Sequence, residues 1–156
     1  RPANVDQEKS LKMMIESISK NADIIKLVFP VHPRTRNKLE KIKLNNKNLI
    51  LSDPLPYFEF NFLVKNSLGV ITDSGGITEE TTVLGIPCIT VRDNTERPET
   101  VEIGTNVLVG TDPKKIKPVL KKMISGDWKK GGIPHLWDGK TAKRIVKHFL
   151  KIIENI

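Results

Sequence analysis

Two hydrophobic periods alternate along the whole chain, and this alternation restricts the fold more than any other feature. Short apolar runs rich in Ile and Val are followed by longer stretches in which apolar residues recur three and four positions apart, as in amphipathic helices. Each short run is nearly continuous in apolar residues, which is typical of parallel strands covered by helices on both faces. The pattern predicts an α/β domain with an open, doubly wound parallel sheet.

The boundaries of the expected elements follow the same pattern. Strands are expected at residues 24–31, 48–52, 68–72, 88–91 and 106–110. Helices are expected at residues 7–19, 35–42, 57–65, 77–84, 98–103, 113–123 and 141–153. Residues 125–139 contain glycines and a proline that cannot continue a helix, so they separate the last helix from the rest. With 156 residues, the chain fits one domain.

The formal net charge of +8 raises the question of nucleic-acid binding. Most of the basic residues are lysines on the outer faces of the expected helices, and aromatic residues make up only 5% of the chain. A surface for stacking bases is therefore not evident, and we expect a solvated basic face with no nucleic-acid partner. A basic nucleic-acid-binding module remains the alternative from a different class. A basic surface also favours small polyanionic ligands.

The single cysteine, Cys88, lies in the apolar run PCITV. One cysteine forms no disulfide framework, and no Cys/His cluster has the spacing of metal ligands, so we expect a buried structural thiol and no metal. No run approaches the ~18 apolar residues of a membrane span, and the first residues lack the apolar core of a signal peptide. We therefore expect a soluble, cytoplasmic protein with no membrane partner.

The stretch VITDSGGITEE places Asp73, Ser74, Gly75 and Gly76 between an expected strand and an expected helix. In an open parallel sheet, ligands bind where such strand-to-helix turns converge. The first N–H groups of a helix lack backbone partners and attract a phosphate, glycines let a ligand approach the backbone, and Ser74 adds a hydroxyl donor. The turn therefore has the chemistry of a diphosphate-binding site.

A purely structural explanation of the same turn stays open at this point. Ser74 would cap the helix, and the two glycines would supply a backbone angle that other residues avoid. The turn contains neither a Walker loop nor a GxGxxG fingerprint. A P-loop lysine is therefore not expected to hold an anion here.

Glu80 follows Gly76 by four residues, on the helix face that looks back toward the turn. Its carboxylate is suited to accept both hydroxyls of a ribose whose phosphates rest on the helix end. The turn and Glu80 together would then recognise one ligand, a nucleoside diphosphate. A carboxylate near a helix N-terminus also stabilises the helix without any ligand.

The loop VRDNTERPE follows the next expected strand and brings Arg92 and Arg97 to the same edge of the sheet. Arginine binds phosphate oxygens in a bidentate manner. The alternative is a set of ion pairs that hold the loop, and we expect one of them between Arg92 and Asp93. Both explanations can hold at once, and Arg97 is the stronger candidate for ligand binding.

A family resemblance is carried by residues 72–112, TDSGGITEETTVLGIPCITVRDNTERPETVEIGTNVLVGTD. This stretch closely resembles the C-terminal half of the non-hydrolysing UDP-N-acetylglucosamine 2-epimerases. The resemblance continues in LPYFEFNFLV, FPVHP and RPANVD, so it covers nearly the whole chain in the same order. It implies a glycosyltransferase B-type fold with the active site between two Rossmann-like halves. Residues 1–156 would be the UDP-holding half, with 141–156 as a terminal crossover helix.

The resemblance also implies roles for individual residues. Glu80 matches the ribose-binding acid, Arg97 a ligand-binding arginine, and Phe60 the aromatic position beside the uracil pocket. The diphosphate-binding turn is matched by Ser74, Gly75 and Gly76. These implied roles agree with the chemistry of the turn and the loop.

Two departures from the family pattern limit what the resemblance implies. The chain begins at Arg1, so the histidine of the family's HRxEN motif would precede it, and no catalytic residue is assigned within the chain. Ala3 stands where bacterial members carry a glutamate that helps to hold a second, allosteric UDP-sugar. Arg1 and His32 match other residues of that second site, although His32 is equally explained as a strand-end histidine bonded to backbone.

The reaction that the resemblance implies interconverts UDP-N-acetylglucosamine and UDP-N-acetylmannosamine, by anti-elimination of UDP and its re-addition. It requires no metal and no cofactor. The acidic residues that handle the carbon-bound proton would belong to the missing N-terminal half, so the chain alone would bind UDP weakly and catalyse little.

The partners implied by the resemblance are UDP, a UDP-N-acetylhexosamine, the N-terminal domain of the same protein and a second copy in a homodimer. The product would serve the synthesis of cell-surface polysaccharides. The donor-nucleotide domain of a glycosyltransferase is the alternative enzyme, because that fold class uses a similar glycine turn and glutamate. The stretch RDNTERPE favours the epimerase over it.

Overall fold

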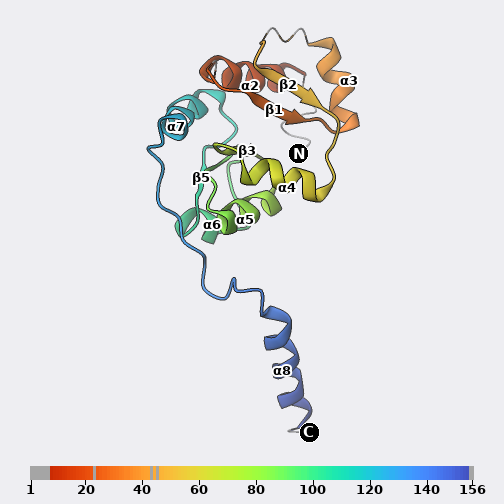
Figure 1. Cartoon of the computed structure of the whole chain (residues 1–156), viewed down its shortest axis with the longest axis vertical. Helices are drawn as coiled ribbons and strands as arrows, with labels where there is room; N and C mark the ends of the chain where they lie inside the picture. Colours follow the sequence, from red (N-terminus) through yellow and green to blue (C-terminus); the bar gives the residue numbers. More distant parts are fainter. Residues whose placement is uncertain (1–7, 23, 43, 45, 155–156) are drawn as a thin grey trace.

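The computed structural model describes residues 8–22, 24–42, 44 and 46–154 of the chain. Strands and helices alternate in the order expected from the sequence, and paired strands run parallel (Figure 1). The α/β class is therefore confirmed. Within the described ranges, no helix is long and apolar enough to cross a membrane.

The strands are short and lie within the ranges expected from the sequence. They are β1 (Leu27–Pro30), β2 (Leu49–Ser52), β3 (Val70–Thr72), β4 (Cys88–Thr90) and β5 (Asn106–Leu108). In one sheet β1 pairs with β2, with Leu27 opposite Leu49. In the other, β4 lies between β3 and β5, with Cys88 opposite both Val70 and Asn106.

The helices connect the strands and cover them. They are α2 (Glu8–Asn21), α3 (Pro33–Lys41), α4 (Tyr57–Lys65), α5 (Gly75–Leu84), α6 (Pro98–Glu102), α7 (Pro113–Ser125) and α8 (Thr141–Ile153). The bounds of α4 and α8 are those expected. Helix α5 begins two residues earlier than expected, because both glycines of the turn belong to its first turn.

The strands pair as two sheets, whereas the sequence predicted one. Within the described residues, no ladder joins β1 and β2 to β3, β4 and β5. The two sheets are connected instead by helix packing, because α2 lies against α7 (Figure 1). Met123 of α7 also packs tightly beside Gly69, where a Cβ atom would come within 2.4 Å of the Met123 sulfur. Side chains of α7 thus join the two parts of the fold.

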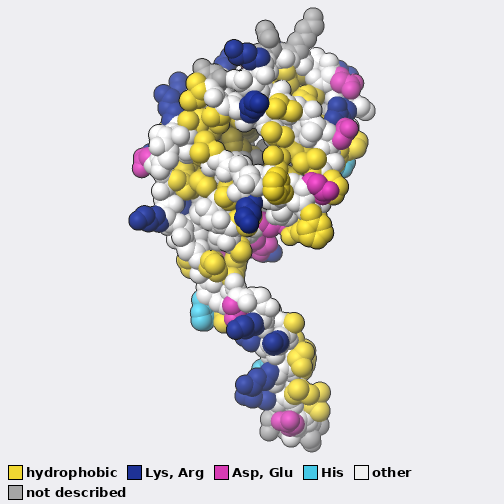
Figure 2. Space-filling model, viewed as in Figure 1, with side chains coloured by type: hydrophobic (Ala, Val, Ile, Leu, Met, Phe, Trp, Pro, Cys, Tyr) yellow, Lys and Arg dark blue, Asp and Glu magenta, His cyan; other side chains and the backbone are white. Residues whose placement is uncertain are grey.

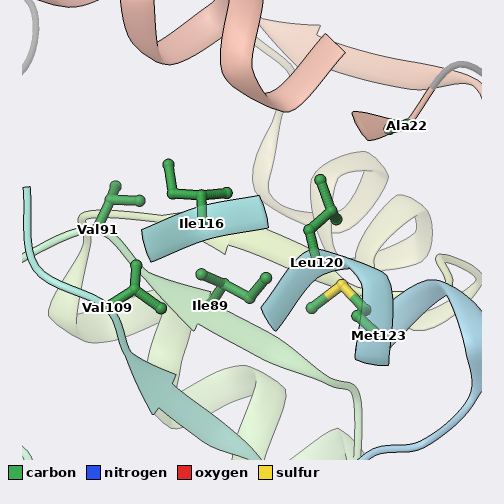
Figure 3. Close-up of a cluster of buried hydrophobic side chains, with 7 residues drawn as sticks. All are labelled: Ala22, Ile89, Val91, Val109, Ile116, Leu120 and Met123. Carbon is green, nitrogen blue, oxygen red and sulfur yellow. The ribbon is translucent and has the colours of Figure 1, made fainter. Parts of the chain in front are cut away.

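The main core lies between α2, α7 and the second sheet. Figure 3 shows that α7 projects its apolar side chains between the strands below and α2 above. The buried cluster consists of Ala22, Ile89, Val91, Val109, Ile116, Leu120 and Met123. Cys88 in β4 is fully buried, as expected, and this burial raises the pKa of its thiol to about 11. The thiol is therefore protonated and structural at neutral pH.

The segment between α7 and α8 is fixed to the turn that precedes β5. The indole Nε1 of Trp128 donates to the carbonyl oxygen of Thr105 at 2.7 Å, and Gly132 N donates to Ile103 O at 2.7 Å. A Cβ atom on Gly131 would meet the backbone of Gly104 at 2.9 Å, so only glycine fits there. The first part of the segment is thus anchored to the body of the domain.

Helix α8 extends away from that body (Figure 1). None of its residues is buried, and its apolar and basic side chains lie on different faces (Figure 2). The large apolar side chains on the uncovered face are Ile145, Val146, Phe149, Leu150, Ile152 and Ile153. Before the helix, Asp138 accepts hydrogen bonds from Lys140 N and from Arg144, and these bonds lower the pKa of its carboxyl group.

A chain of buried polar groups stabilises the second sheet. Thr90 Oγ1 donates to Asn106 Oδ1 at 2.6 Å, and Asn106 Nδ2 donates to Thr100 Oγ1 at 3.1 Å. The Asn106 side chain is fully buried, so its amide has no access to water if a partner is lost.

We predict that Asn106→Ala lowers the free energy of unfolding by about 2–4 kcal/mol, because it removes two buried hydrogen bonds and leaves a cavity. Urea denaturation of the chain measures this loss. Asn37→Ala, at an exposed position in α3, is the matched control and should change the value by less than about 0.5 kcal/mol. Equal effects of the two substitutions would contradict the structural role of the buried amide.

Candidate functional site

The site is centred on the N-terminus of α5, directly after β3. Ser74 is the N-cap residue, with an extended backbone, but its hydroxyl makes no capping hydrogen bond within the described residues. Its backbone N–H donates to Thr72 Oγ1 at 3.1 Å instead. The alternative in which Ser74 only caps the helix through its side chain is therefore wrong.

The two glycines leave the end of α5 open. A Cβ atom on Gly75 would meet nothing closer than Glu96 Oε2 at 3.8 Å, and one on Gly76 only Ser74 Oγ at 4.0 Å. Neither glycine has a positive φ, so the alternative that they supply an unusual backbone angle is wrong. Their effect is to leave the first N–H groups of the helix uncovered, and those groups attract anions.

The loop after β4 is fixed by a buried arginine. The side chain of Arg92 is 6% exposed, and its Nη1 and Nη2 each donate to one carboxylate oxygen of Glu96 at 2.8 Å. This hydrogen-bonded pair raises the pKa of Arg92, and the negative charge of Asp73 adds to the effect. The expected pairing of Arg92 with Asp93 is wrong, because the guanidinium group pairs with Glu96, while Asp93 accepts from Thr111 N at 3.2 Å.

Arg97 reaches from this loop to the first turns of α5. Its Nε donates to Glu79 Oε1, and its Nη1 donates to the backbone oxygen of Glu96 at 3.1 Å. Its side chain is still 44% exposed. The structure therefore brings a solvent-accessible guanidinium group to the helix that begins at the glycine turn, already paired with a carboxylate that the sequence analysis did not connect to it.

A groove of about 420 Å³ lies between α4 and α5, beside these groups. Its lining residues are Tyr57, Asn61, Glu79, Glu80, Val83, Leu84 and Trp137. Glu80 thus lines the groove together with Glu79, whose carboxylate accepts a hydrogen bond from Arg97. Trp137 was missed by the sequence analysis; an aromatic residue in a segment of glycines and prolines was its only signal.

The remaining candidate residues lie outside this groove. Phe60 is half-buried on α4 and does not line the groove. His32 is the exposed N-cap residue of α3, and its Nδ1 accepts a hydrogen bond from Arg34 N at 3.3 Å, which fits the structural explanation of this histidine. Arg1 and Ala3 lie outside the described residues. Within those residues, no group of three or more His, Cys, Asp or Glu side chains is arranged to hold a metal ion.

The chemistry of the site suits an elongated ligand that has an anionic end and a remainder with both hydroxyl groups and apolar surface. An uncovered helix N-terminus and an accessible guanidinium attract negative charge. The groove next to them combines a carboxylate, which accepts hydroxyl groups, with aromatic and aliphatic walls.

Comparison with known proteins identifies relatives over nearly the whole chain. A family profile described as UDP-N-acetylglucosamine 2-epimerase matches residues 1–150. The UDP-N-acetylglucosamine 2-epimerase of Methanocaldococcus jannaschii is 40% identical over 156 residues, which cover 94% of this chain and 42% of the relative. The enzyme of the same name from Escherichia coli K12 is 42% identical over 105 residues, which cover 66% of this chain and 28% of the relative.

Solved structures of UDP-GlcNAc 2-epimerases resemble the fold of this chain. The M. jannaschii UDP-GlcNAc 2-epimerase, solved in complex with UDP-GlcNAc and UDP, has a TM-score of 0.79 and 39% identity, covering 97% of this chain and 43% of that one. The Neisseria meningitidis UDP-GlcNAc 2-epimerase, bound to UDP-GlcNAc, has a TM-score of 0.81 and 30% identity, covering 97% of this chain and 42% of that one. The chain thus spans about two-fifths of the length of these relatives. Because the family profile matches nearly every residue, the chain belongs to the UDP-N-acetylglucosamine 2-epimerase family.

Proposed function

We propose that this chain is the UDP-holding part of an enzyme that interconverts UDP-N-acetylglucosamine and UDP-N-acetylmannosamine. The observation that carries the proposal is the uncovered N-terminus of α5 with Arg97 and the Glu80 groove beside it. The proposal is supported by the relatives, whose structures contain UDP-GlcNAc and UDP. The groups present in the site match the two polar parts of a UDP molecule, the diphosphate and the ribose.

Each part of UDP has a proposed partner in the chain. The diphosphate lies against the N–H groups of Gly75 and Gly76 and the hydroxyl of Ser74, and Arg97 binds it from the loop. The ribose hydroxyls donate to Glu80. Phe60 is proposed to stand beside the uracil, and because it lies outside the groove, the base would extend beyond the groove toward α4.

These contacts support elimination and re-addition. When the bond between the sugar C1 and the phosphate oxygen breaks, its electrons remain on UDP, and negative charge develops on the leaving phosphate. Helix N–H groups and Arg97, fixed before the reaction, stabilise that charge. The same contacts hold UDP while its oxygen attacks C1 again on the face that it left, and the return of a proton to the opposite face of C2 inverts that carbon. We assign transfer of the C2 proton to acidic residues in the part of the protein that corresponds to the remaining length of the relatives.

Helix α8 is proposed to be the crossover element to that further half. Its apolar face is uncovered, and the relatives are more than twice as long as the matched region. The longer protein is proposed to be a cytoplasmic homodimer. The proposed second site for a UDP-sugar, with Arg1 and His32, belongs to the same longer protein, and Ala3 weakens it.

We predict that the 156-residue chain binds UDP in preference to AMP and to short DNA, because the site combines diphosphate and ribose partners. Isothermal titration calorimetry with each ligand at the same ionic strength measures this. Tighter binding of the oligonucleotide, with a steep loss on adding salt and no heat from UDP, would instead support the nucleic-acid alternative.

We predict that Glu80→Gln weakens UDP binding by roughly 10- to 100-fold, the effect of losing hydrogen bonds to a charged acceptor. The midpoint of thermal unfolding should stay unchanged, because Glu80 is half-exposed. Glu40→Gln, on the exposed surface of α3, is the matched control and should leave UDP affinity unchanged. A variant that loses stability but keeps its UDP affinity would show that Glu80 only stabilises the helix.

We predict that the backbone amides of residues 145–152 exchange rapidly with solvent in this chain and become protected in a protein of the relatives' full length. The reason is that packing protects helical amides, and α8 lacks packing here. Hydrogen exchange of both proteins measures the difference. Equal protection in the two would mean that the helix does not cross to a second half.

A further inference from the structure

We propose that Arg92 is a positioning residue for phosphate binding, which acts through Glu96 to fix the guanidinium group of Arg97. This inference rests on the proposed function, because it concerns how the UDP-binding arginine is held. Arg92 itself is too deeply buried to be the main contact of a ligand.

The first step of the argument is the rigidity of Arg92. Its backbone oxygen accepts a hydrogen bond from Gly110 N at 2.9 Å, which ties it to the end of β5. Its side chain is buried and binds both carboxylate oxygens of Glu96. A bidentate pair constrains both partners in distance and in angle, so Glu96 is held in place although its own side chain is 55% exposed.

The second step leads from Glu96 to Arg97. The backbone oxygen of Glu96 accepts from Arg97 Nη1, and the carboxylate of Glu79 accepts from Arg97 Nε. The backbone N–H of Arg97 also donates to Thr95 Oγ1 at 3.1 Å. Two bonds to different nitrogen atoms fix the plane of a guanidinium group. Within the described part of the chain, Nη2 of Arg97 donates to no protein group and stays available for a phosphate oxygen.

The third step concerns charge at the same place. Glu96 Oε2 lies 3.8 Å from the point where a Cβ of Gly75 would be, so its negative charge stands beside the proposed phosphate position. Arg92 neutralises that charge. A test of positioning must therefore keep both charges and change only the geometry of the pair.

Two charge-conserving substitutions meet this requirement. Arg92→Lys replaces the fork by a single ammonium group, and Glu96→Asp shortens the partner by one methylene group. We expect each to lower UDP affinity by about tenfold, the effect of about one charge-assisted hydrogen bond, and to leave uridine affinity, measured by NMR titration, unchanged. Arg36→Lys, which alters the exposed pair with Asp53, is the matched control and should change neither affinity.

A double-mutant cycle distinguishes positioning from a general structural role. In an Arg97→Gln background, Arg92→Lys and Glu96→Asp should cause no further loss of UDP affinity, because the group that they position is absent. If Arg92→Lys does not fold, Glu96→Asp decides the question, since its side chain is largely exposed.

The outcomes separate this inference from the proposed function. UDP binding that neither substitution changes, losses that add to that of Arg97→Gln, or equal losses for UDP and uridine would overturn the positioning role alone. A failure of the unsubstituted chain to bind UDP would overturn the proposed function, and the positioning role with it.

Discussion

The parallel pairing of β3 with β4 is the constraint on which the candidate site depends. Val91 N donates to Thr72 O at 2.9 Å, just where both strands end. Because the strands run in the same direction and stop at the same level, the turn that starts α5 and the loop that carries Arg97 leave the sheet side by side. The glycine turn and Arg97, more than twenty positions apart in the chain, are thereby brought to one helix end before any ligand binds.

A network of buried polar groups also connects the strands of the second sheet to Arg97. The buried hydrogen bonds from Thr90 to Asn106 and from Asn106 to Thr100 continue to the surface, because Thr100 Oγ1 donates to the backbone oxygen of Arg97 at 2.7 Å. The backbone of Arg97 is therefore bonded to the buried network through Thr100, and its side chain is bonded to Glu79. Such satisfied buried networks are rigid, since every member loses a partner if one of them moves.

The sequence predicted those features that depend on local patterns. Apolar periodicity identified the strands and gave the bounds of α4 and α8, and a strand-to-helix turn was correctly expected between β3 and α5, although its two glycines belong to the helix. Features that depend on spatial neighbours were not predictable. The partner of Arg92 was expected to be the adjacent Asp93, but the loop folds back so that Glu96, four residues on, meets it. The division into two sheets and the presence of Trp137 in the same groove as Glu80 both depend on the arrangement of segments far apart in the chain.

The segment before α8 ties the groove to the helix that follows it. Arg144 in the first turns of α8 donates to Asp138 and to the backbone oxygen of Leu136 at 2.8 Å, so the residues on either side of Trp137 are bound to the base of the helix. Residues up to Gly132 are anchored elsewhere, on the turn before β5. If α8 swings, the bend must fall between these two anchors, and the indole ring travels with the helix. The part of the groove wall that Trp137 forms therefore depends on the direction in which α8 points.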